Sequence, residues 1–344
     1  MKVAVIGASG YVGAELIALL CGHDKISLNH LVVSEHSSSA EKTFSELHPK
    51  YAGICDLPLT PFSAQWLAQA AGDLDAVFFA TPHEFSATWA QAFIEYGVKV
   101  FDLSGGFRLK KLEDYPTYYE FEHQYSELLD QAVYGLAEWQ AEEIKQTNLV
   151  AVPGCYPTAS LLSLKPITHH QLHKMDGLIV VNGVSGVSGA GRKASLATSF
   201  NEVSLTPYNI LQHRHQPEIS QEAGASVIFN PHLAPYKRGL LVTITLQLKA
   251  DVTEAQVKQA YLTTYQDKPL VRLVDTWPKV DNVAHTPFAD VHWKYEQDQQ
   301  VLVVSCAIDN LLKGAASQAI QCANISLGLA SDYGLINTAL RGSC

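Results

Sequence analysis

The first third of the chain alternates short apolar runs with segments whose apolar residues recur at helical spacing. Residues 2–6 (KVAVI) form a β-branched run, and residues 14–23 (AELIALLCGH) carry apolar positions three and four apart. Further strands are predicted at 28–33, 75–80 and 98–103, and further helices at 65–71 and 87–96. Strands that alternate with helices predict an α/β domain built on a parallel, doubly wound sheet.

The pattern changes after about residue 150. Longer strands are predicted at 177–184, 240–248 and 301–309, and the alternation of VTITLQL is typical of an antiparallel sheet. Residues 310–329 are predicted to form a long amphipathic helix. We therefore expect a dinucleotide-binding domain over 1–150, completed by a C-terminal helix within about 310–344, and an α+β catalytic and oligomerisation domain over 151–309 with a mostly antiparallel sheet.

Length, charge and cysteine usage narrow the class of protein. A chain of 344 residues, 47% of them hydrophobic, is long enough for two cores. Its formal net charge of −10 argues against a nucleic-acid surface or an anionic membrane as partner. No stretch approaches 18 apolar residues, and the six cysteines are scattered without a CxxC pair. We expect a cytoplasmic protein with reduced thiols and a small-molecule substrate.

The stretch GASGYVG at 7–13 follows the first strand and opens the first helix. Glycines at this turn let the backbone approach a pyrophosphate, whose charge the helix N-terminus stabilises. The spacing is GxxGxxG rather than GxGxxG, and a purely structural turn is the alternative. A Rossmann-type dinucleotide site predicts contacts from Gly7, Ser9, Gly10, Tyr11 and Val12.

The end of the second predicted strand bears on which nicotinamide cofactor is used. An NAD site usually places Asp or Glu there, on the ribose hydroxyls. Here the strand ends at Ser34, with Ser37 and Lys42 following, and hydroxyls with a lysine suit a 2′-phosphate better. We therefore expect NADP(H), with Ser34 and Ser37 in the site. Glu35 argues against this interpretation, and a solvated serine loop is the alternative.

Cys155 lies between the apolar run NLVAV and the predicted start of a helix, in the stretch PGCYPTA. A thiol close to helix-N-terminal amides has a lowered pKa and a larger thiolate fraction. Cys21, Cys306 and Cys322 fall inside predicted helices and strands and are expected in the core. Although isolated cysteines are mostly small buried hydrophobes, this setting favours Cys155 as a nucleophile.

A cysteine nucleophile beside a nicotinamide cofactor predicts one reaction. A carboxylate resists hydride, but an acyl phosphate can acylate a thiolate, and the resulting thioester accepts hydride. Collapse of the thiohemiacetal then needs an acid–base partner, and His213 and His215 are candidates. Surface histidines are the alternative. A zinc site at this pair is disfavoured because no further ligand is near in sequence, and we expect no metal.

Together these segments resemble the N-acetyl-γ-glutamyl-phosphate reductase family of arginine biosynthesis, over nearly the whole chain. The matching stretches are GASGYVGAELI at 7–17, ATPHEFS at 80–86, DLSGGFRL at 102–109, YGLAEW at 134–139, PGCYPTA at 153–159, SGVSGAGR at 185–192, HRHQPEI at 213–219 and NLLKGAASQAIQ at 310–321. The resemblance implies NADPH-dependent reduction of N-acetyl-γ-glutamyl phosphate to the semialdehyde and phosphate, through a thioacyl intermediate.

The resemblance also assigns roles to individual residues. Cys155 is implied as the thiolate and His215 as the acid–base residue. The implied substrate contacts are Arg108, Ser185 and Arg192, with Arg108 beside the phosphate; a surface ion pair is the alternative for Arg108. The implied further cofactor contacts are Ser188, Gly189 and Asn310, and helix capping is the alternative for Asn310.

Two departures from the family pattern stand out. Gly105 and Gly106 replace the more usual Ala-Asp, which we expect to loosen the loop carrying Arg108, and Ala137 stands where proline is common. The aromatic and acidic segment 114–130 is expected at the substrate side or an interface. A homodimer or homotetramer is expected from the family alone, and the residues that contact the acetyl group cannot be named.

Other functions stay open at this stage. A sister reductase of the same build could act on aspartyl phosphate, or on an α-aminoadipyl phosphate attached to a carrier protein. A non-catalytic NADP-binding scaffold would need Cys155 to be inert. A disulfide-exchange protein is disfavoured because the sequence has no resolving CxxC partner.

Overall fold

The protein is described by a computed structural model over residues 1–336, so the last part of the predicted segment 310–344 lies outside the described residues. The chain divides into two compact units. Unit 1 comprises residues 1–153 together with the residues from Ala315 onward, and unit 2 comprises Gly154–Gly314.

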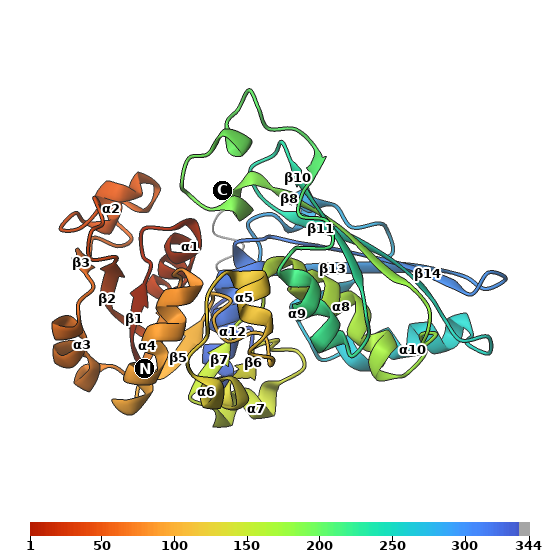
Figure 1. Cartoon of the computed structure of the whole chain (residues 1–344), viewed down its shortest axis with the longest axis horizontal. Helices are drawn as coiled ribbons and strands as arrows, with labels where there is room; N and C mark the ends of the chain where they lie inside the picture. Colours follow the sequence, from red (N-terminus) through yellow and green to blue (C-terminus); the bar gives the residue numbers. More distant parts are fainter. Residues whose placement is uncertain (337–344) are drawn as a thin grey trace. The chain divides into compact units, whose positions relative to one another are not determined.

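Unit 1 is built on a seven-stranded sheet with the order β3-β2-β1-β4-β5-β7-β6. All of its strand pairs are parallel, which confirms the doubly wound sheet (Figure 1). The strands are β1 (Lys2–Ile6), β2 (Ser27–Val33), β3 (Leu59–Pro61), β4 (Ala76–Phe79), β5 (Lys99–Asp102), β6 (Val133–Tyr134) and β7 (Leu149–Ala151).

The helices of unit 1 cover this sheet. They are α1 (Tyr11–Cys21), α2 (Phe44–Leu47), α3 (Ala64–Ala70), α4 (His83–Glu95), α5 (Asp114–Tyr119), α6 (Ser126–Gln131), α7 (Ala141–Gln146) and α12 (Ser317–Ser326), with 3₁₀ turns at Pro49–Tyr51 and Ala71–Asp73. Every residue of β4 is buried, as expected for a parallel strand covered on both faces. Because the order 3-2-1-4-5 reverses between β1 and β4, the ends of these two strands form the edge where such folds bind dinucleotides.

Unit 2 contains a second seven-stranded sheet, with the order β12-β13-β14-β11-β8-β10-β9. Its strands are β8 (Ile179–Gly186), β9 (Thr206–Pro207), β10 (Ile228–Ala234), β11 (Leu240–Gln247), β12 (Val271–Leu273), β13 (Ala289–Glu296) and β14 (Val301–Ile308). The β8–β10 and β12–β13 pairs are parallel and the remaining pairs antiparallel. The expected mostly antiparallel sheet is therefore confirmed.

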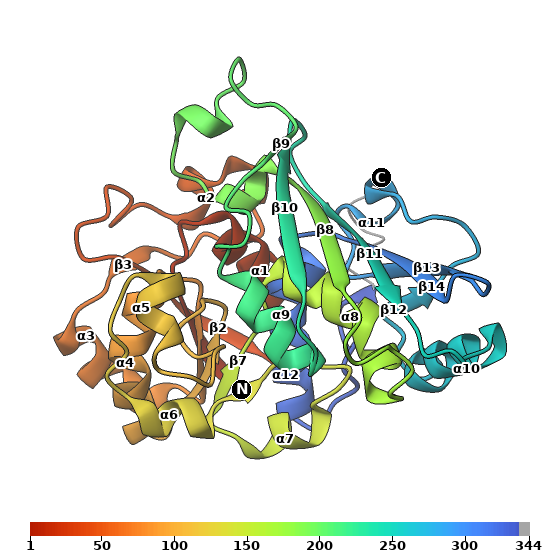
Figure 2. The same cartoon turned by 45° about the vertical axis from the view of Figure 1, so that its right-hand side comes forward.

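Helices pack on one face of this second sheet. They are α8 (Cys155–His169), α9 (His215–Ala223) and α10 (Glu254–Tyr265), and the shorter elements are α11 (Val280–Val283), the 3₁₀ turns η3 (Val187–Ala190) and η4 (Leu196–Thr198), and the π-helical turn η5 (Leu312–Ala316). Figure 2 shows β8, β10 and β11 running side by side beside α8 and α9. Along β11, Leu240, Val242, Ile244 and Leu246 are buried, whereas the alternate residues are half-buried or exposed.

Two expectations about local structure were wrong. The predicted amphipathic helix over 310–329 begins with the π-helical turn η5, and in α12 every residue from Ser317 to Ile325 is buried. A helix buried all round has no polar face, so its polar side chains must bond to the protein; Gln318 Nε2 donates to Gly135 O at 3.1 Å. Cys21, expected in the core, is exposed at the end of α1.

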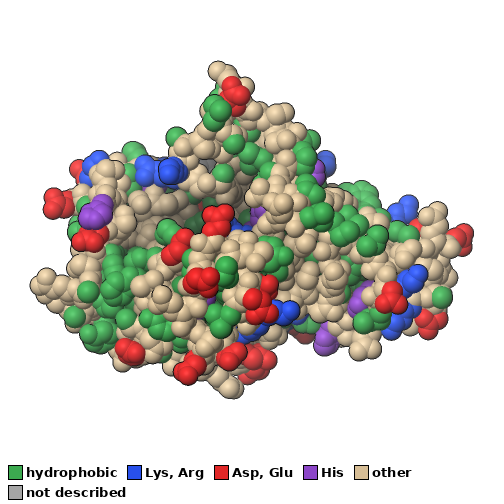
Figure 3. All heavy atoms as spheres, viewed as in Figure 1, with side chains coloured by type: hydrophobic (Ala, Val, Ile, Leu, Met, Phe, Trp, Pro, Cys, Tyr) green, Lys and Arg blue, Asp and Glu red, His purple; other side chains and the backbone are tan. Residues whose placement is uncertain are grey.

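The segment 114–130 contributes aromatic side chains to the core of unit 1. Tyr115 and Tyr119 are buried and stack at 5.5 Å between ring centroids, and both belong to the hydrophobic cluster that includes strand residues of the first sheet. Exposed acidic side chains lie along this segment and the following helix α7, at Glu113, Glu120, Glu122, Glu127, Asp130, Glu142 and Glu143. Figure 3 shows acidic side chains gathered over the α5–α7 region of this unit.

None of the helices in residues 1–336 combines the length and apolarity needed to cross a membrane.

Candidate active site

The glycine-rich turn after β1 has the geometry of a dinucleotide cradle. Gly7 has φ +90°, and a Cβ there would come within 2.1 Å of Ala80 O at the end of β4. A Cβ on Gly13 would come within 2.4 Å of Gly7 O, so glycine permits the close packing of α1 on β1. Gly10 precedes α1 as its N-cap and has no side chain that could occupy the helix N-terminus. A pyrophosphate could therefore approach these backbone N–H groups.

The other predicted cofactor residues of unit 1 surround this turn and the end of β2. Tyr11 begins α1 and is 40% exposed, and Ser9 and Val12 are half-buried. Ser34 is exposed directly after β2, whereas the Ser37 hydroxyl accepts a hydrogen bond from the Ser39 N–H at 3.2 Å. The Ser37 N–H also donates to Ser34 O at 3.0 Å, so both serines belong to the turn after β2.

Arg108 lies at the carboxyl edge of the first sheet and is 6% exposed. Its Nε donates to Val152 O and its Nη2 to Leu103 O, both at 2.8 Å, so the guanidinium joins the ends of β5 and β7. Asp102, fully buried, lies at the end of β5. Burial raises the pKa of the Asp102 carboxyl, while hydrogen bonds from Ser104 and Ser86 and the charge of Arg108 act in the opposite direction.

The two glycines before Arg108 lie in a hydrogen-bonded loop, and the expected loosening stays a prediction. The Gly105 N–H donates to His83 Nδ1 at 2.7 Å, and the Gly106 N–H donates to the Ser104 hydroxyl at 3.0 Å. A Cβ on Gly105 would come within 2.1 Å of Cε1 of Tyr119. The aromatic ring of Tyr119 therefore occupies the space that a side chain at residue 105 would need.

Cys155 is the first residue of α8, as the sequence predicts, and it is half-buried. Gly154 is the N-cap, with extended φ and ψ of −67° and 160°, and contributes no capping side chain. The N-terminus of a helix carries a partial positive charge, which favours an anionic thiolate at this position.

His213 and His215 lie together although the segment between them is not extended, because α9 begins at His215. Their ring centroids are 4.7 Å apart, and His213 Nδ1 accepts the backbone N–H of His215 at 3.1 Å. His213 packs among the rings of Tyr156, Tyr208 and Phe229. Burial, with the neighbouring Arg214 charge, lowers the pKa of His213 to about 4, so this imidazole is neutral at neutral pH.

Glu218 connects the two helices and carried no assignment from the sequence. It is fully buried on α9, one turn after His215, and its Oε1 accepts the Gly154 N–H at 3.0 Å. One carboxylate therefore joins the helix of His215 to the residue before Cys155. The i, i+3 spacing of His215 and Glu218 within HRHQPEI was the available signal, but it was readable only once this segment was known to be helical.

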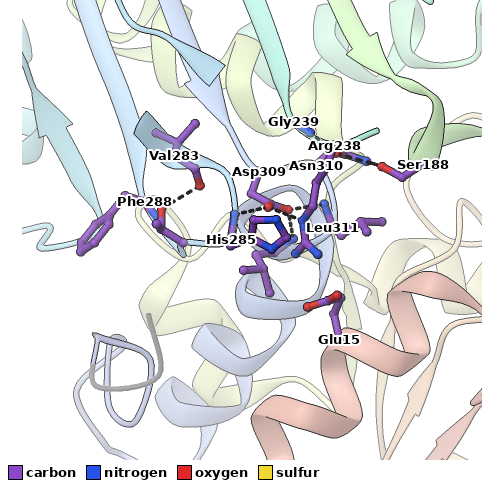
Figure 4. A network of polar contacts seen from close by, with 12 residues as sticks. Glu15, Ser188, Arg238, Gly239, Val283, His285, Phe288, Asp309, Asn310 and Leu311 are labelled. Atoms are coloured by element: carbon purple, nitrogen blue, oxygen red, sulfur yellow. Dashed lines mark hydrogen bonds and ion pairs between the residues drawn. The ribbon is translucent and has the colours of Figure 1, made fainter. Parts of the chain in front are cut away.

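Four further predicted residues of unit 2 gather at η3. Asn310 Nδ2 donates to the Ser188 hydroxyl at 3.0 Å (Figure 4). A Cβ on Gly189 would come within 3.0 Å of the Ser185 Oγ. Asn310 Oδ1 accepts the Gly239 N–H at 2.7 Å, so its side chain does not cap the following turn. Arg192 lies beyond η3 and is exposed.

Within residues 1–336 no group of three or more His, Cys, Asp and Glu side chains could hold a metal ion. The predicted cofactor turn and Arg108 belong to unit 1, whereas Cys155, His215, Ser185, Ser188, Gly189, Arg192 and Asn310 belong to unit 2. Unit 2 therefore offers a thiol, an imidazole and a buried carboxylate for catalysis, and unit 1 offers a glycine-rich turn for a dinucleotide.

Comparison with known proteins covers both units. A family model described as "Semialdehyde dehydrogenase, NAD binding domain" matches residues 2–147, and one described as "Semialdehyde dehydrogenase, dimerisation domain" matches residues 155–310. Among solved structures, aspartate semialdehyde dehydrogenase II from Vibrio cholerae, complexed with ASA, has a TM-score of 0.70 at 19% identity, covering 96% of this chain and 98% of that one. Aspartate semialdehyde dehydrogenase with NADP from Candida albicans has a TM-score of 0.65 at 17% identity, covering 94% and 97%. These structures share the fold.

Curated relatives are much more similar in sequence. N-acetyl-γ-glutamyl-phosphate reductase of Aeromonas hydrophila is 52% identical, covering 98% of this chain and 100% of that protein. The proteins of the same name from Pseudoalteromonas atlantica and Aliivibrio fischeri are 50% and 53% identical, covering 98% and 95% of this chain and 98% and 97% of those proteins. The chain is thus an oxidoreductase and belongs to the N-acetyl-γ-glutamyl-phosphate reductase family of the semialdehyde dehydrogenases.

Proposed function

We propose that the chain catalyses the NADPH-dependent reduction of N-acetyl-γ-glutamyl phosphate to N-acetylglutamate 5-semialdehyde and phosphate, a step of arginine biosynthesis. Its relatives of that name span nearly the whole chain at about half identity, which supports this substrate over aspartyl phosphate. The observation that carries the mechanism is the linkage of Cys155, through Gly154 and Glu218, to the helix that begins at His215.

Cys155 is the nucleophile in this proposal. Its thiolate, favoured at the first position of α8, attacks the acyl carbon of the substrate, the C–O bond to phosphate breaks, and inorganic phosphate leaves. The product of this step is a thioester on Cys155. A thioester carbonyl is electrophilic enough to accept a hydride, whereas a free carboxylate is not.

His215 is the acid–base residue. Hydride addition to the thioester leaves an oxyanion, which the His215 imidazolium protonates; when the C–S bond breaks, the proton returns to His215, and aldehyde and thiolate are released. His213, neutral at neutral pH and hydrogen-bonded through Nδ1 to the His215 N–H, supports the start of α9 instead. This division of tasks favours His215 over its neighbour.

Unit 1 is proposed as the dinucleotide-binding domain. The bound nicotinamide supplies the hydride. Gly7 and Gly13 allow α1 to pack closely on β1 and β4, and Gly10 leaves the N-terminus of α1 without a capping side chain, so a pyrophosphate can approach there. Ser9, Tyr11 and Val12 adjoin the same turn. The exposed Ser34 after β2, together with Lys42, suits the 2′-phosphate of NADP, so we expect a higher kcat/KM with NADPH than with NADH.

The remaining residues hold substrate and cofactor in the proposal. Arg108 is the phosphate-binding residue: its bonds to two backbone carbonyls fix the guanidinium at the edge of the sheet, and a planar guanidinium matches phosphate geometry. Ser185 and Arg192 contact the substrate, and Ser188, Gly189 and Asn310 contact the cofactor. These assignments are supported by the contacts that place Ser185, Ser188, Gly189 and Asn310 together at η3.

Unit 2 is proposed as both the catalytic and the oligomerisation domain. The face of its sheet opposite the helices carries half-buried Val180, Val184, Leu241, Thr243, Val301 and Val303. The family model over this region is described as a dimerisation domain. A second copy of the chain would cover these side chains, so a homodimer formed through this face is the expected assembly.

The direct test is the reverse reaction, NADPH formation from N-acetylglutamate semialdehyde, phosphate and NADP⁺. We expect a phosphate-dependent rate that falls by at least 1,000-fold in Cys155→Ser and that is at least tenfold weaker with aspartate semialdehyde. Activity that survives in Cys155→Ser would remove the nucleophile assignment. A preference for aspartate semialdehyde would transfer the chain to the sister activity.

A further inference from the structure

One buried carboxylate in unit 2, that of Asp309, binds three chain segments, at Arg238, at His285 and at Leu311 and Leu312. Asp309 follows β14 and is fully buried. Its Oδ2 accepts hydrogen bonds from Arg238 Nε at 2.5 Å and from the His285 N–H at 2.6 Å (Figure 4). Its Oδ1 accepts the N–H groups of Leu311 and Leu312, each at 2.9 Å. No sequence motif assigns a role to Asp309.

The bonds to Leu311 and Leu312 make Asp309 the cap of η5. The Asp309 carbonyl oxygen also accepts the Gly314 N–H at 2.9 Å, so both its side chain and its backbone fix the start of the π-helical turn. Such turns inside helices are uncommon and frequently occur at functional sites. The capping function that the sequence offered as the alternative for Asn310 therefore belongs to Asp309.

The turn capped by Asp309 lies directly against Cys155. A Cβ on Gly314 would come within 2.7 Å of the Cys155 Cβ and within 3.1 Å of its Cα. The backbone at Gly314 therefore packs directly against Cys155. A small shift of η5 would change the orientation that the Cys155 side chain can adopt.

The neighbouring residue extends the same network to η3. Asn310 bonds the Ser188 hydroxyl and the Gly239 N–H, and Gly239 follows Arg238, the ion-pair partner of Asp309. Asp309 and Asn310 thus hold two sides of the predicted site through one short segment.

The network depends on the charge of Asp309. A buried carboxylate is costly unless it is paired and hydrogen-bonded, and here Arg238, itself about 10% exposed, and three backbone N–H groups meet that need. His285 adopts φ +64°, an uncommon conformation for a residue other than glycine, and its N–H is aimed at Asp309.

We propose that Asp309 is a positioning residue for the cysteine chemistry: by capping η5 and pairing with Arg238, it fixes the backbone at Gly314 behind Cys155 and, through Asn310, the Ser188 turn. The proposal rests on the proposed function for its catalytic meaning. The part of the proposal that concerns the orientation of Cys155 does not depend on which acyl phosphate is the substrate.

The test compares Asp309→Asn with Asp290→Asn in the full chain. Asp290 is a matched control, because it is also almost fully buried and its Oδ1 accepts Arg272 Nε at 2.6 Å in the same sheet. The first readout is the rate constant for iodoacetamide alkylation of Cys155 at pH 7, followed by peptide mass, which does not depend on the fraction of active enzyme. The second is the separation of kcat from KM for NADP⁺ in the reverse reaction.

For Asp309→Asn we expect the alkylation rate constant of Cys155 to change by at least fivefold and kcat to fall by at least tenfold. KM for NADP⁺ should rise by at least twofold, because the Ser188 turn, proposed to contact the cofactor, loses its support through Asn310. Asp290→Asn should leave both readouts within twofold. Wild-type rates in folded Asp309→Asn, or equal effects in the two variants, would overturn the proposal. If the wild type itself lacks phosphate-dependent activity, the proposed function fails, while the alkylation comparison still decides the role of Asp309.

A second variant covers the case in which Asp309→Asn does not fold because it leaves the Arg238 charge buried without its anion. The double variant Asp309→Asn/Arg238→Met removes both charges, and replacing a whole buried ion pair is often tolerated. It should fold, by circular dichroism, and retain the altered alkylation rate and low kcat. Wild-type reactivity in the folded double variant, or failure of both variants to fold, would show that Asp309 serves stability alone.

Discussion

Two adjacent histidines of unit 2 have different surroundings and therefore different expected tasks. His213 packs against the rings of Tyr156, Tyr208 and Phe229, whereas His215, which also packs against Tyr156, is the first residue of α9 and lies one turn before Glu218. The pattern HRH alone could not separate them, because their difference arises from side chains that the fold brings in from α8 and β10. At the scale of single residues, burial lowers the pKa of His213 and keeps this imidazole neutral at neutral pH.

The depressed pKa of His213, about 4, predicts a pH dependence of stability. In the unfolded chain this histidine binds a proton below about pH 6.5, but in the folded protein it does so only near pH 4, so folding is penalised increasingly as the pH falls through this window. The penalty reaches about 3 kcal/mol. Urea unfolding between pH 7 and 4 should show a shallower loss of stability in His213→Asn than in the wild type. Parallel curves would contradict the assignment.

Glu218 predicts a graded response to substitution. Glu218→Ala leaves the buried Gly154 N–H without its acceptor, at a cost of about 1–3 kcal/mol, and disturbs the residue before the nucleophile. We expect a kcat reduced by at least tenfold. Glu218→Gln retains an acceptor oxygen and should lie between the alanine variant and the wild type. An alanine variant that matches the wild type in both kcat and unfolding free energy would argue against this coupling.

At the scale of elements, strongly patterned segments were predictable and buried polar ones were not. The four strands β1, β2, β4 and β5 lie where the apolar runs predict them, since a parallel strand covered on both faces is apolar over most of its length. The short strands β3, β6 and β7 were not predicted. The start of α8 at Cys155 was also readable, from its Pro-Gly turn. The π-helical turn η5 was not, because it depends on the cap from Asp309 and on contact with Cys155, which lies far away in sequence.

The loop between β5 and Arg108 offers a test of packing between elements. Gly105→Ala places a methyl group against the Tyr119 ring and should destabilise the protein by about 1–3 kcal/mol. Tyr119→Ala opens that space at its own cost. The double variant should lose less unfolding free energy, measured with urea, than the two single variants lose together, because the methyl group no longer meets the ring. Strict additivity would mean that the ring does not limit residue 105.

At the scale of the whole molecule, the chain separates its tasks between two units of different sheet type. The parallel sheet of unit 1 offers the edge and glycine turn for a dinucleotide, and the mixed sheet of unit 2 carries the thiol and the histidine. The pattern of apolar and polar positions predicted both sheet types, and eight sequence motifs carried the full-length family resemblance. It could not predict which polar side chains meet, because these contacts join residues far apart in sequence.

The half-buried face of the second sheet predicts a change in assembly. Thr243→Arg places a charge in the middle of that face, and we expect it to convert a dimer into a monomer in sedimentation-velocity measurements. Gln259→Arg adds the same charge at an exposed position on α10 and should leave the dimer intact. A Thr243→Arg protein with the wild-type sedimentation coefficient would move the interface elsewhere.

The most direct measurement of the central claim is to trap the covalent intermediate. The protein is mixed with N-acetylglutamate semialdehyde and NADP⁺ without phosphate, quenched in acid, and analysed by intact mass and peptide mapping. We predict a burst of one NADPH per chain and a thioester-linked N-acetylglutamyl group on Cys155, absent in Cys155→Ser and released as acyl phosphate when phosphate is added before the quench. NADPH formation without an adduct, or an adduct on another residue, would contradict the account.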